Sequence, residues 1–246
     1  MLAIIGGSGL SQLRGLEIVR REVVRTPYGE PSCPVMIGRL KGRLTAFLAR
    51  HGQGHTIAPH EINYRANLWA LKKQGAESVV SVAAVGGIAS DLAPGTLVVP
   101  HQIIDYTWGR KHTFFEGEAP VTHIDFTEPF SSELREEVLA AALECREPMR
   151  DGGVYAITQG PRLETAAEID RLERDGATLV GMTGMPEAAL ARELEIPYAA
   201  IAVVANFAAG RGDSRVRIDL VNIDQVLRDG MARVARIMEK LVERSR

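Results

Sequence analysis

The sequence predicts a single-domain α/β fold in which buried strands alternate with helices and each strand leads into a loop. The apolar runs 79–85 and 197–205 are almost continuous, as in strands that are buried on both faces of a sheet. Apolar residues recur at helical spacing in 59–75 and again from 219 onward. A chain of 246 residues can bury one sizeable core, so we expect residues 1–246 to form one domain.

Composition and charge exclude several classes of protein. The net charge is -2 with 24% charged residues, and no basic block predicts a nucleic-acid partner. The longest apolar runs fall well short of the roughly 18 residues that a membrane span needs. Residues 1–5 lack a basic segment and lead directly into glycine, which indicates a first strand and not a signal peptide. Cys33 and Cys145 form neither a disulfide framework nor a metal cluster. We therefore expect a cytoplasmic protein without a membrane partner.

The first strand, 3–5, leads into the glycine-rich turn 6–9. Glycines let backbone N–H groups approach a ligand closely, and the hydroxyl of Ser8 can hydrogen-bond a phosphate or another anion. The spacing matches neither the dinucleotide fingerprint nor the nucleophile elbow of hydrolases. A plain tight turn is therefore the competing interpretation.

A second strand, 43–49, places Arg50 and His51 on a loop that also holds two glycines and His55. An arginine fork presents several fixed donors to an oxyanion, and an imidazole adds another. The alternative is an ordinary polar turn, but the crowding of glycines and histidines favours an anion site.

The middle of the chain adds a helix over 59–75, the strand 79–85 with a glycine exit, and short strands at 97–100 and 102–105. Residues 106–130 have no regular pattern, which in a compact domain is typical of a functional loop or an interface. His123 and Asp125 lie in this segment without a complete ligand set, so we expect no metal site.

The second half repeats a strand, loop and helix unit. Strands at 154–157 and 178–181 lead into loops and then into helices at 167–175 and 186–194, after an earlier helix over 131–143 that Ser131 caps. The last core strand, 197–205, ends at Asn206. A mobile loop over 207–217 and a C-terminal helix from residue 219 complete the expected elements.

Six motifs in this order resemble the trimeric purine nucleoside phosphorylase and methylthioadenosine phosphorylase family over almost the whole chain. The resemblance implies a twisted mixed β-sheet flanked by helices, a homotrimer, and phosphorolysis of an N-glycosidic bond. It also implies that no metal or organic cofactor takes part and that inorganic phosphate is the co-substrate. The motifs are Gly6–Leu10, Arg50–Gly52, Asn63–Leu71, Ala84–Gly87, Gly160–Glu164 and Gly181–Glu187.

The resemblance also implies roles for single residues. The phosphate site would contain Ser8, Arg50, His51, Ala83, Ala84 and Thr183, with Ala83 at a position where relatives often place a further donor. The ribose and purine would contact Met182, Tyr64, Leu163, Glu164, Asn206 and Ala208, and the catalytic roles would go to Asn206, Glu164 and His51. Around the 5′-substituent the resemblance implies Val221, Ile223 and, from the neighbouring subunit, His123.

The base pocket predicts the substrate. Relatives of the methylthioadenosine type carry aspartates after the last core strand and a serine in the Gly-Pro-Arg loop, whereas this chain has Asn206 and Glu164, as 6-oxopurine phosphorylases do. A carboxylate accepts the N1–H that hypoxanthine presents and adenine lacks, and an amide can donate to O6 or N7. Together with an apolar 5′ pocket, these residues predict S-methyl-5′-thioinosine as the substrate.

Other functions remain open from the sequence. Within the family, the alternatives are a general inosine and guanosine phosphorylase and then a methylthioadenosine phosphorylase. Outside enzymes, the alternative is a nucleoside-binding protein, although a binder need not keep both the phosphate and the base residues. A nicotinamide-dependent enzyme conflicts with the glycine spacing and with the missing acidic residue that would bind the ribose.

Overall fold

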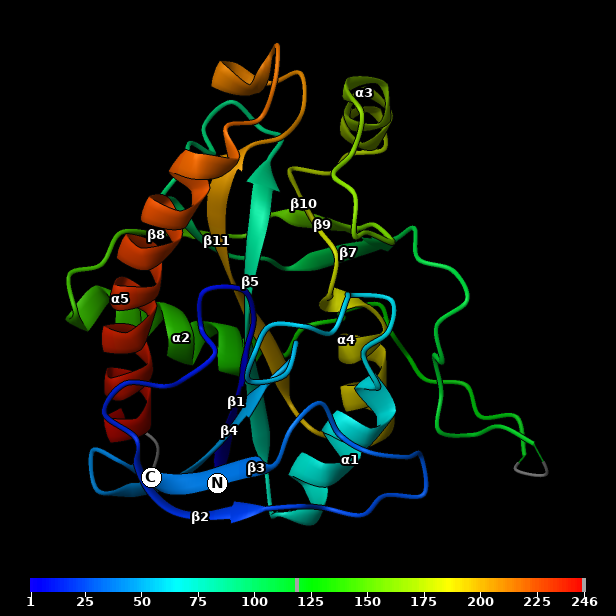
Figure 1. Cartoon of the computed structure of the whole chain (residues 1–246), viewed down its shortest axis with the longest axis vertical. Coiled ribbons are helices and arrows are strands. Elements are labelled where there is room, and N and C mark those ends of the chain that lie inside the picture. Colours follow the sequence, from blue (N-terminus) through cyan, green and yellow to red (C-terminus); the bar gives the residue numbers. More distant parts are fainter. Residues whose placement is uncertain (118–119, 245–246) are drawn as a thin grey trace.

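Strand β5 (Ser78–Gly87) runs through the middle of one mixed sheet in the computed structural model (Figure 1). The structure describes residues 1–117 and 120–244, without the side chains of 220–222. Eleven strands of the described chain join this sheet, in the order β2-β3-β4-β1-β5-β10-β9-β7 with β11, β6 and β8 branching from β5. The further strands are β1 (Leu2–Gly6), β2 (Glu17–Glu22), β3 (Val35–Leu40), β4 (Arg43–Ala49), β6 (Leu97–Val99), β7 (Gln102–Asp105), β8 (Met149–Asp151), β9 (Val154–Ile157), β10 (Leu179–Gly181) and β11 (Tyr198–Phe207).

The directions of the strands bring several loops to one place. Strands β4, β1, β5 and β11 are parallel to their neighbours in this group, so their carboxyl ends meet at one edge. Strand β10 pairs with β5 in the antiparallel direction, with Leu179 opposite Gly87 and Val180 opposite Gly86. The loop after β10 therefore turns back along β5 toward the loops after β1 and β4. The predicted mixed sheet with flanking helices is confirmed.

Helices cover the sheet on both sides (Figure 1). Helices α1 (Tyr64–Lys73) and α4 (Gly184–Glu193) pack on one apolar cluster, and α2 (Ser132–Glu144) and α5 (Leu220–Arg244) pack on another. Alternate residues of β5 divide between the two, with Val79 in the first cluster and Val80 in the second, because successive side chains of a strand point to opposite faces. A third cluster lies beneath α3 (Ala166–Arg174).

Local capping sets where the helices begin. Ser131 accepts a hydrogen bond from the backbone N–H of Leu134, which confirms the predicted cap of α2. Thr165 and Glu168 form a capping box at the start of α3, which was not predicted. The prediction that a helix begins at residue 59 is wrong. Helix α1 begins at Tyr64, since the side chain of Asn63 accepts from the N–H of Ala66 and the chain before it forms turns.

Two regions differ from simple expectation. The edge strand β2 was not predicted, because five of its six residues are exposed and no apolar alternation marks it. The loop after β11 was expected to be mobile, yet it contains a short 3₁₀ helix (Gly212–Ser214) and Arg211 forms ion pairs with Asp170 and Glu173 of α3.

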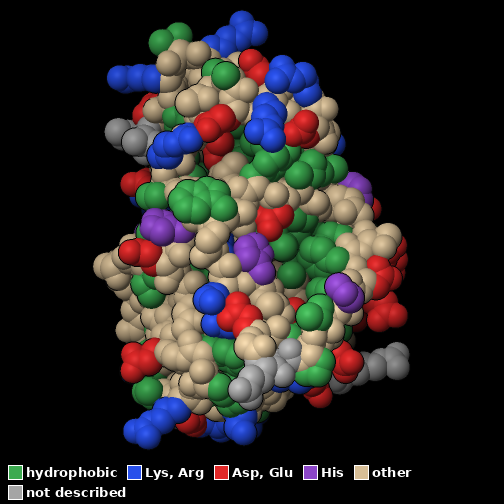
Figure 2. All heavy atoms as spheres, turned by 90° about the vertical axis from the view of Figure 1, so that its right-hand side faces the viewer, with side chains coloured by type: hydrophobic (Ala, Val, Ile, Leu, Met, Phe, Trp, Pro, Cys, Tyr) green, Lys and Arg blue, Asp and Glu red, His purple; other side chains and the backbone are tan. Residues whose placement is uncertain are grey.

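The face that carries residues 106–130 shows apolar side chains gathered across its middle, with charged side chains crowding its upper end near α3 (Figure 2). Trp108 and Val121 of this segment are 71% and 82% exposed. The described residues of 106–130 form no helix or strand, as predicted. Across the described chain, every helix lacks the combination of length and apolar character that crossing a bilayer requires.

Candidate functional site

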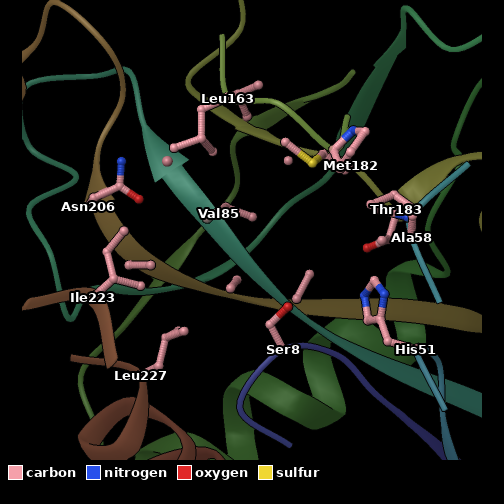
Figure 3. A pocket seen from close by; sticks show the side chains of 18 of the residues that line it. Ser8, His51, Ala58, Val85, Leu163, Met182, Thr183, Asn206, Ile223 and Leu227 are labelled. Carbon is pink, nitrogen blue, oxygen red and sulfur yellow. The ribbon is translucent and has the colours of Figure 1, made fainter. Parts of the chain in front are cut away.

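A cavity of about 470 Å³ opens where the ends of β5 and β11 meet the loops after β1, β4, β9 and β10. Figure 3 shows Asn206, Ile223 and Leu227 on one side of it, with Met182, Thr183 and His51 on the other. Twelve of the residues that the sequence predicts for the site line this cavity, although they come from separate parts of the chain. They are Ser8, Arg50, His51, Ala83, Ala84, Leu163, Glu164, Met182, Thr183, Asn206, Ala208 and Ile223.

The turn after β1 lies against β5 so tightly that only glycine fits. A Cβ atom at Gly7 would overlap the carbonyl oxygen of Val82 and lie 2.8 Å from Nη1 of Arg50. Close backbone approach of this kind is the reason for a glycine-rich turn at an anion site. The hydroxyl oxygen of Ser8 lies 3.4 Å from Nε2 of His55, so the two side chains stand together at the mouth of the turn.

The guanidinium of Arg50 is fully buried and already binds a carboxylate. Its Nε donates to Oε2 of Glu187 at 2.7 Å and its Nη2 donates to Oε1 at 2.8 Å. Nη1 and Nη2 also donate to Val82 O and Ser81 Oγ, each at 3.0 Å. Burial alone would lower the pKa of Arg50, but the Glu187 carboxylate outweighs it and the pKa is raised. The fork that the sequence suggests for an oxyanion is therefore filled by Glu187, and one of the five N–H groups of Arg50, on Nη1, is left for a ligand.

His51 is a neutral imidazole with a defined tautomer. It is 6% exposed, and burial, followed by the charge of Arg50, lowers its pKa to about 4. Nδ1 lies 2.8 Å from the carbonyl oxygen of Ile57, which can only accept, so Nδ1 carries the proton. Nε2 then has a free lone pair and can accept a hydrogen bond, for instance from a protonated phosphate oxygen.

The depressed pKa of His51 predicts a loss of stability in mild acid. An unfolded histidine gains its proton near pH 6.5, whereas the folded one stays neutral until about pH 4. Between these values the unfolded state binds more protons, so the free energy of unfolding should fall by up to about 3 kcal/mol as the pH drops. Urea unfolding of the wild type and of His51→Gln, in buffers without phosphate, measures this difference. The exposed His60→Gln is the control, and a pH profile of His51→Gln parallel to that of the wild type would contradict the prediction.

The wall opposite the turn is held by a buried arginine that the sequence did not suggest. Arg110 is 8% exposed and lies in the irregular segment after β7. Its Nη1 donates to the carbonyl oxygens of Met182 at 2.8 Å and Met185 at 2.6 Å, while its Nη2 donates to those of Thr158 at 3.3 Å and Gln159 at 2.9 Å. Arg110 thus ties the loop after β9 to the loop after β10, and no local pattern in the sequence marks it.

Met182 and Thr183 follow β10 and face the cavity. Gly160 has a φ of +63°, and a Cβ there would lie 2.5 Å from Sδ of Met182, so the methionine packs directly on the loop after β9. Thr183 is 6% exposed and immediately precedes helix α4. An apolar thioether and a buried hydroxyl therefore lie side by side on the same side of the cavity as His51 (Figure 3).

The predicted base-reading residues lie at the other end. Glu164 and Leu163 reach the cavity from the loop after β9, and Asn206 and Ala208 reach it from the end of β11. The Nδ2 of Asn206 donates to the carbonyl oxygen of Phe207 at 2.7 Å, which leaves the second proton of the amide for another acceptor. A carboxylate and an amide thus approach the same space from different strands.

Helix α5 supplies an apolar border. Ile223 and Leu227, which are four residues apart and so share one face of the helix, line the cavity beside Ile218. Ile223 was predicted to lie here. Leu227 was not, although its position one helical turn after Ile223 is a signal in the sequence that points to it. Val221 was predicted with Ile223, but its side chain lies outside the described residues.

Two predicted site residues lie elsewhere. Tyr64 was expected to contact the ribose, but it is 3% exposed and is not among the described residues that line the cavity. Its hydroxyl donates to Pro59 O at 2.9 Å and accepts from Arg110 at 3.3 Å, so it packs beneath the cavity wall. His123 is exposed on the long loop and does not line the cavity of its own chain within the described residues. Its predicted contribution to a neighbouring subunit remains a prediction.

The loop after β4 contributes more to the cavity than the sequence predicted. Residues 55–59 line it together with Arg50 and His51, and the rings of His51 and His55 lie 4.6 Å apart. The concentration of glycine and histidine in 51–55 is the signal that points to this loop.

Comparison with known proteins identifies the family of the chain. The profile of the Phosphorylase superfamily matches residues 1–243. A probable S-methyl-5'-thioinosine phosphorylase from Pseudomonas syringae pv. tomato is 54% identical over 244 residues, which cover 99% of this chain and 98% of that one. A 6-oxopurine nucleoside phosphorylase from Pyrococcus furiosus is 46% identical over 87% of this chain and 82% of its own.

A solved structure gives the same result for the fold. The methylthioadenosine phosphorylase from Schistosoma mansoni in complex with adenine superposes with a TM-score of 0.93 at 33% identity, covering 98% of this chain and 90% of that chain. The profile match over residues 1–243 and the 54% identity to a relative over nearly the full length lead to one conclusion: this chain belongs to the Phosphorylase superfamily.

Proposed function

We propose that this protein cleaves S-methyl-5′-thioinosine with inorganic phosphate, giving hypoxanthine and 5-methylthioribose 1-phosphate. The observation that carries the proposal is the composition of one cavity. Glu164 and Asn206 line it together with Ser8, His51 and Thr183, and Ile223 with Leu227 forms an apolar border. Asn206 lies across the cavity from His51 and Thr183 (Figure 3). The name of the relative from Pseudomonas syringae, which is 54% identical, supports the same substrate.

The reaction follows from where charge develops. As the glycosidic bond stretches, the sugar gains the character of an oxocarbenium ion and the purine gains negative charge. Phosphate held near Ser8, His51 and Thr183 attacks the sugar carbon and stabilises the cation. Asn206 stabilises the departing 6-oxopurine by an N–H hydrogen bond that is in place before the glycosidic bond breaks, while Glu164 holds the base by accepting from its N1–H. Phosphate is the nucleophile, so the proposed reaction uses no side-chain nucleophile, metal or organic cofactor.

The assembly belongs to the same proposal. We expect a homotrimer in which His123 of one subunit reaches the 5′ end of the next subunit's cavity. The exposed Trp108 and Val121 on the same loop support a contact surface there, because large apolar side chains on a surface loop favour an interface. The cytoplasmic location stays a prediction from the sequence.

A general 6-oxopurine nucleoside phosphorylase is the second candidate. The relative from Pyrococcus furiosus, which is 46% identical, favours it, and the same Glu164 and Asn206 would serve. The two candidates differ in the 5′ group, where Ile223 and Leu227 favour a methylthio group over a hydroxyl because burying an unpaired hydroxyl costs free energy.

The test is release of free base from methylthioinosine, methylthioadenosine and inosine, measured side by side with and without phosphate. A large, phosphate-dependent preference for methylthioinosine is expected. Preference for methylthioadenosine would refute the interpretation of Glu164 and Asn206, and equal use of inosine would refute the apolar 5′ pocket. Absence of phosphate-dependent cleavage of all three would indicate a nucleoside-binding protein instead.

A further inference from the structure

Thr158 stands beside the base end of the cavity in a rigid position. It directly follows β9, its backbone N–H donates to Gly181 O at 2.8 Å, and its carbonyl oxygen accepts from Nη2 of Arg110 at 3.3 Å. A β-branched side chain has few rotamers, so a backbone fixed from both sides also fixes the direction of the hydroxyl.

The hydroxyl of Thr158 binds the carboxylate of Glu164. Its Oγ1 lies 2.6 Å from Oε1 of Glu164 and 3.4 Å from Gly181 O. A hydroxyl has one proton, and the shorter contact, at the length typical of a hydrogen bond to a charged oxygen, takes it. Thr158 is therefore the donor and Oε1 of Glu164 the acceptor.

Glu164 has space on two sides, so this hydrogen bond decides where its carboxylate lies. The residue lines the large cavity and also a second cavity of about 260 Å³, which Thr158 and Gln159 line with it. Within the described residues, the Thr158 bond is the single hydrogen bond that holds the Glu164 carboxylate. Without it, a side chain with three rotatable bonds could turn from the base toward the second cavity.

We propose that Thr158 is a specificity-determining positioning residue that holds Glu164 toward the base as a hydrogen-bond acceptor. This inference rests on the proposed function, in which Glu164 binds the N1–H of a 6-oxopurine. With Oε1 engaged by the Thr158 proton, Oε2 is the oxygen left for that N1–H. The N1 of a 6-aminopurine is an acceptor and finds no proton there, so the hydroxyl of Thr158, which never touches the substrate, sets the preference between the two bases.

Two variants of Thr158 distinguish the effect of its hydroxyl from the effect of its branched shape. Thr158→Val keeps the branched shape and removes the donor, whereas Thr158→Ser keeps the donor. We expect Thr158→Val to lower kcat/KM for methylthioinosine about tenfold, mainly through a higher KM. The ratio of kcat/KM for methylthioinosine to kcat/KM for methylthioadenosine should fall by a similar factor. Thr158→Ser should stay within about threefold of the wild type. The matched control is Thr178→Val, which removes a hydroxyl that accepts from Val154 N at 3.0 Å, outside the cavity.

A double-mutant cycle tests whether Thr158 acts through Glu164. Glu164→Gln alone should lower the preference for methylthioinosine, and adding Thr158→Val should change it no further. Independent, multiplicative losses, or an unchanged preference in a folded Thr158→Val protein, would overturn the inference. Thermal unfolding of each variant shows whether it is folded.

Calorimetry with free bases separates this inference from the proposed function. The wild type should bind hypoxanthine more tightly than adenine, and Thr158→Val should lose that preference while Thr178→Val keeps it. If no nucleoside is cleaved, but the wild type prefers hypoxanthine and Thr158→Val loses that preference, the proposed function is refuted and the role of Thr158 is supported. A wild type without the preference for hypoxanthine would overturn the inference itself.

Discussion

Replacing Asn206 by alanine should lower kcat/KM for methylthioinosine about 10²–10³-fold, the usual cost of losing one donor aimed at developing charge. Asn206 lines the cavity from the end of β11, and its Nδ2 is oriented by a hydrogen bond to Phe207 O at 2.7 Å. In the proposed reaction its amide stabilises the leaving purine, so the loss should fall on kcat more than on KM. Steady-state kinetics with methylthioinosine and saturating phosphate measures it.

The control for this prediction is a second amide outside the cavity. Gln225 is exposed on α5 and its Nε2 donates to Asp229, so Gln225→Ala should retain the activity of the wild type. Thermal unfolding should show both variants folded. Near-normal turnover by Asn206→Ala would remove Asn206 from the leaving-group role. Asn206→Asp extends the test, because a carboxylate cannot donate to O6 and should also disfavour the 6-oxopurine.

Glu187→Gln should reduce the free energy of unfolding by about 3–5 kcal/mol, the cost of leaving a buried charge without its partner. Glu187 is fully buried, and its two oxygens accept from Nε and Nη2 of Arg50, with a third bond from the hydroxyl of Tyr198 at 2.8 Å. A glutamine keeps the shape but turns an N–H₂ toward the donors of the guanidinium. Urea unfolding at neutral pH measures the loss.

Glu168→Gln is the matched control, since Glu168 pairs with Arg162 through two similar hydrogen bonds on the surface. Its loss should stay below about 1 kcal/mol, because exposed pairs contribute little. The double variant Arg50→Met/Glu187→Leu should recover part of the stability lost in Glu187→Gln, as apolar replacements of buried pairs do. Equal effects of Glu187→Gln and Glu168→Gln would show that the buried pair has no special role.

The Arg50–Glu187 pair also bears on how phosphate is held. The positive charge of Arg50 is balanced by Glu187, and His51 is neutral. In the proposed phosphate site, none of these three residues therefore offers a free positive charge to the phosphate dianion. Binding then depends on donors at fixed positions, such as the backbone of the turn at Gly7 and the hydroxyls of Ser8 and Thr183. The alanine at position 83 makes each of these donors more important.

Much of the site was predictable because its residues follow strands. Apolar runs and the glycines after them are local signals, and they correctly located β1, β4, β5, β9, β10 and β11 and the loops that end them. The residues on those loops meet because parallel strands bring their carboxyl ends to one edge of the sheet. The family resemblance then assigned their roles, and twelve of the predicted residues line the one cavity.

Other features depend on partners far away in the chain, and no local pattern encodes them. Glu187 lies 137 residues from Arg50, and Arg110 reaches carbonyl oxygens 48 to 75 residues away. A guanidinium that is buried by folding is stable only when its N–H groups are hydrogen-bonded. The acceptors are therefore the groups that packing brings close in space, whatever their distance along the chain. For the same reason Tyr64 packs beneath the cavity wall with Arg110.

By itself, the sequence determined the fold class and the strand ends that carry the site, because hydrophobic period and turn glycines act over a few residues. Through the family resemblance it also determined twelve of the residues that line the cavity. The tertiary structure alone decided that β10 runs antiparallel to β5, that the fork of Arg50 is filled by Glu187, and that Thr158 holds the carboxylate of Glu164. Each of these depends on hydrogen bonds whose geometry exists only once separate segments have packed together.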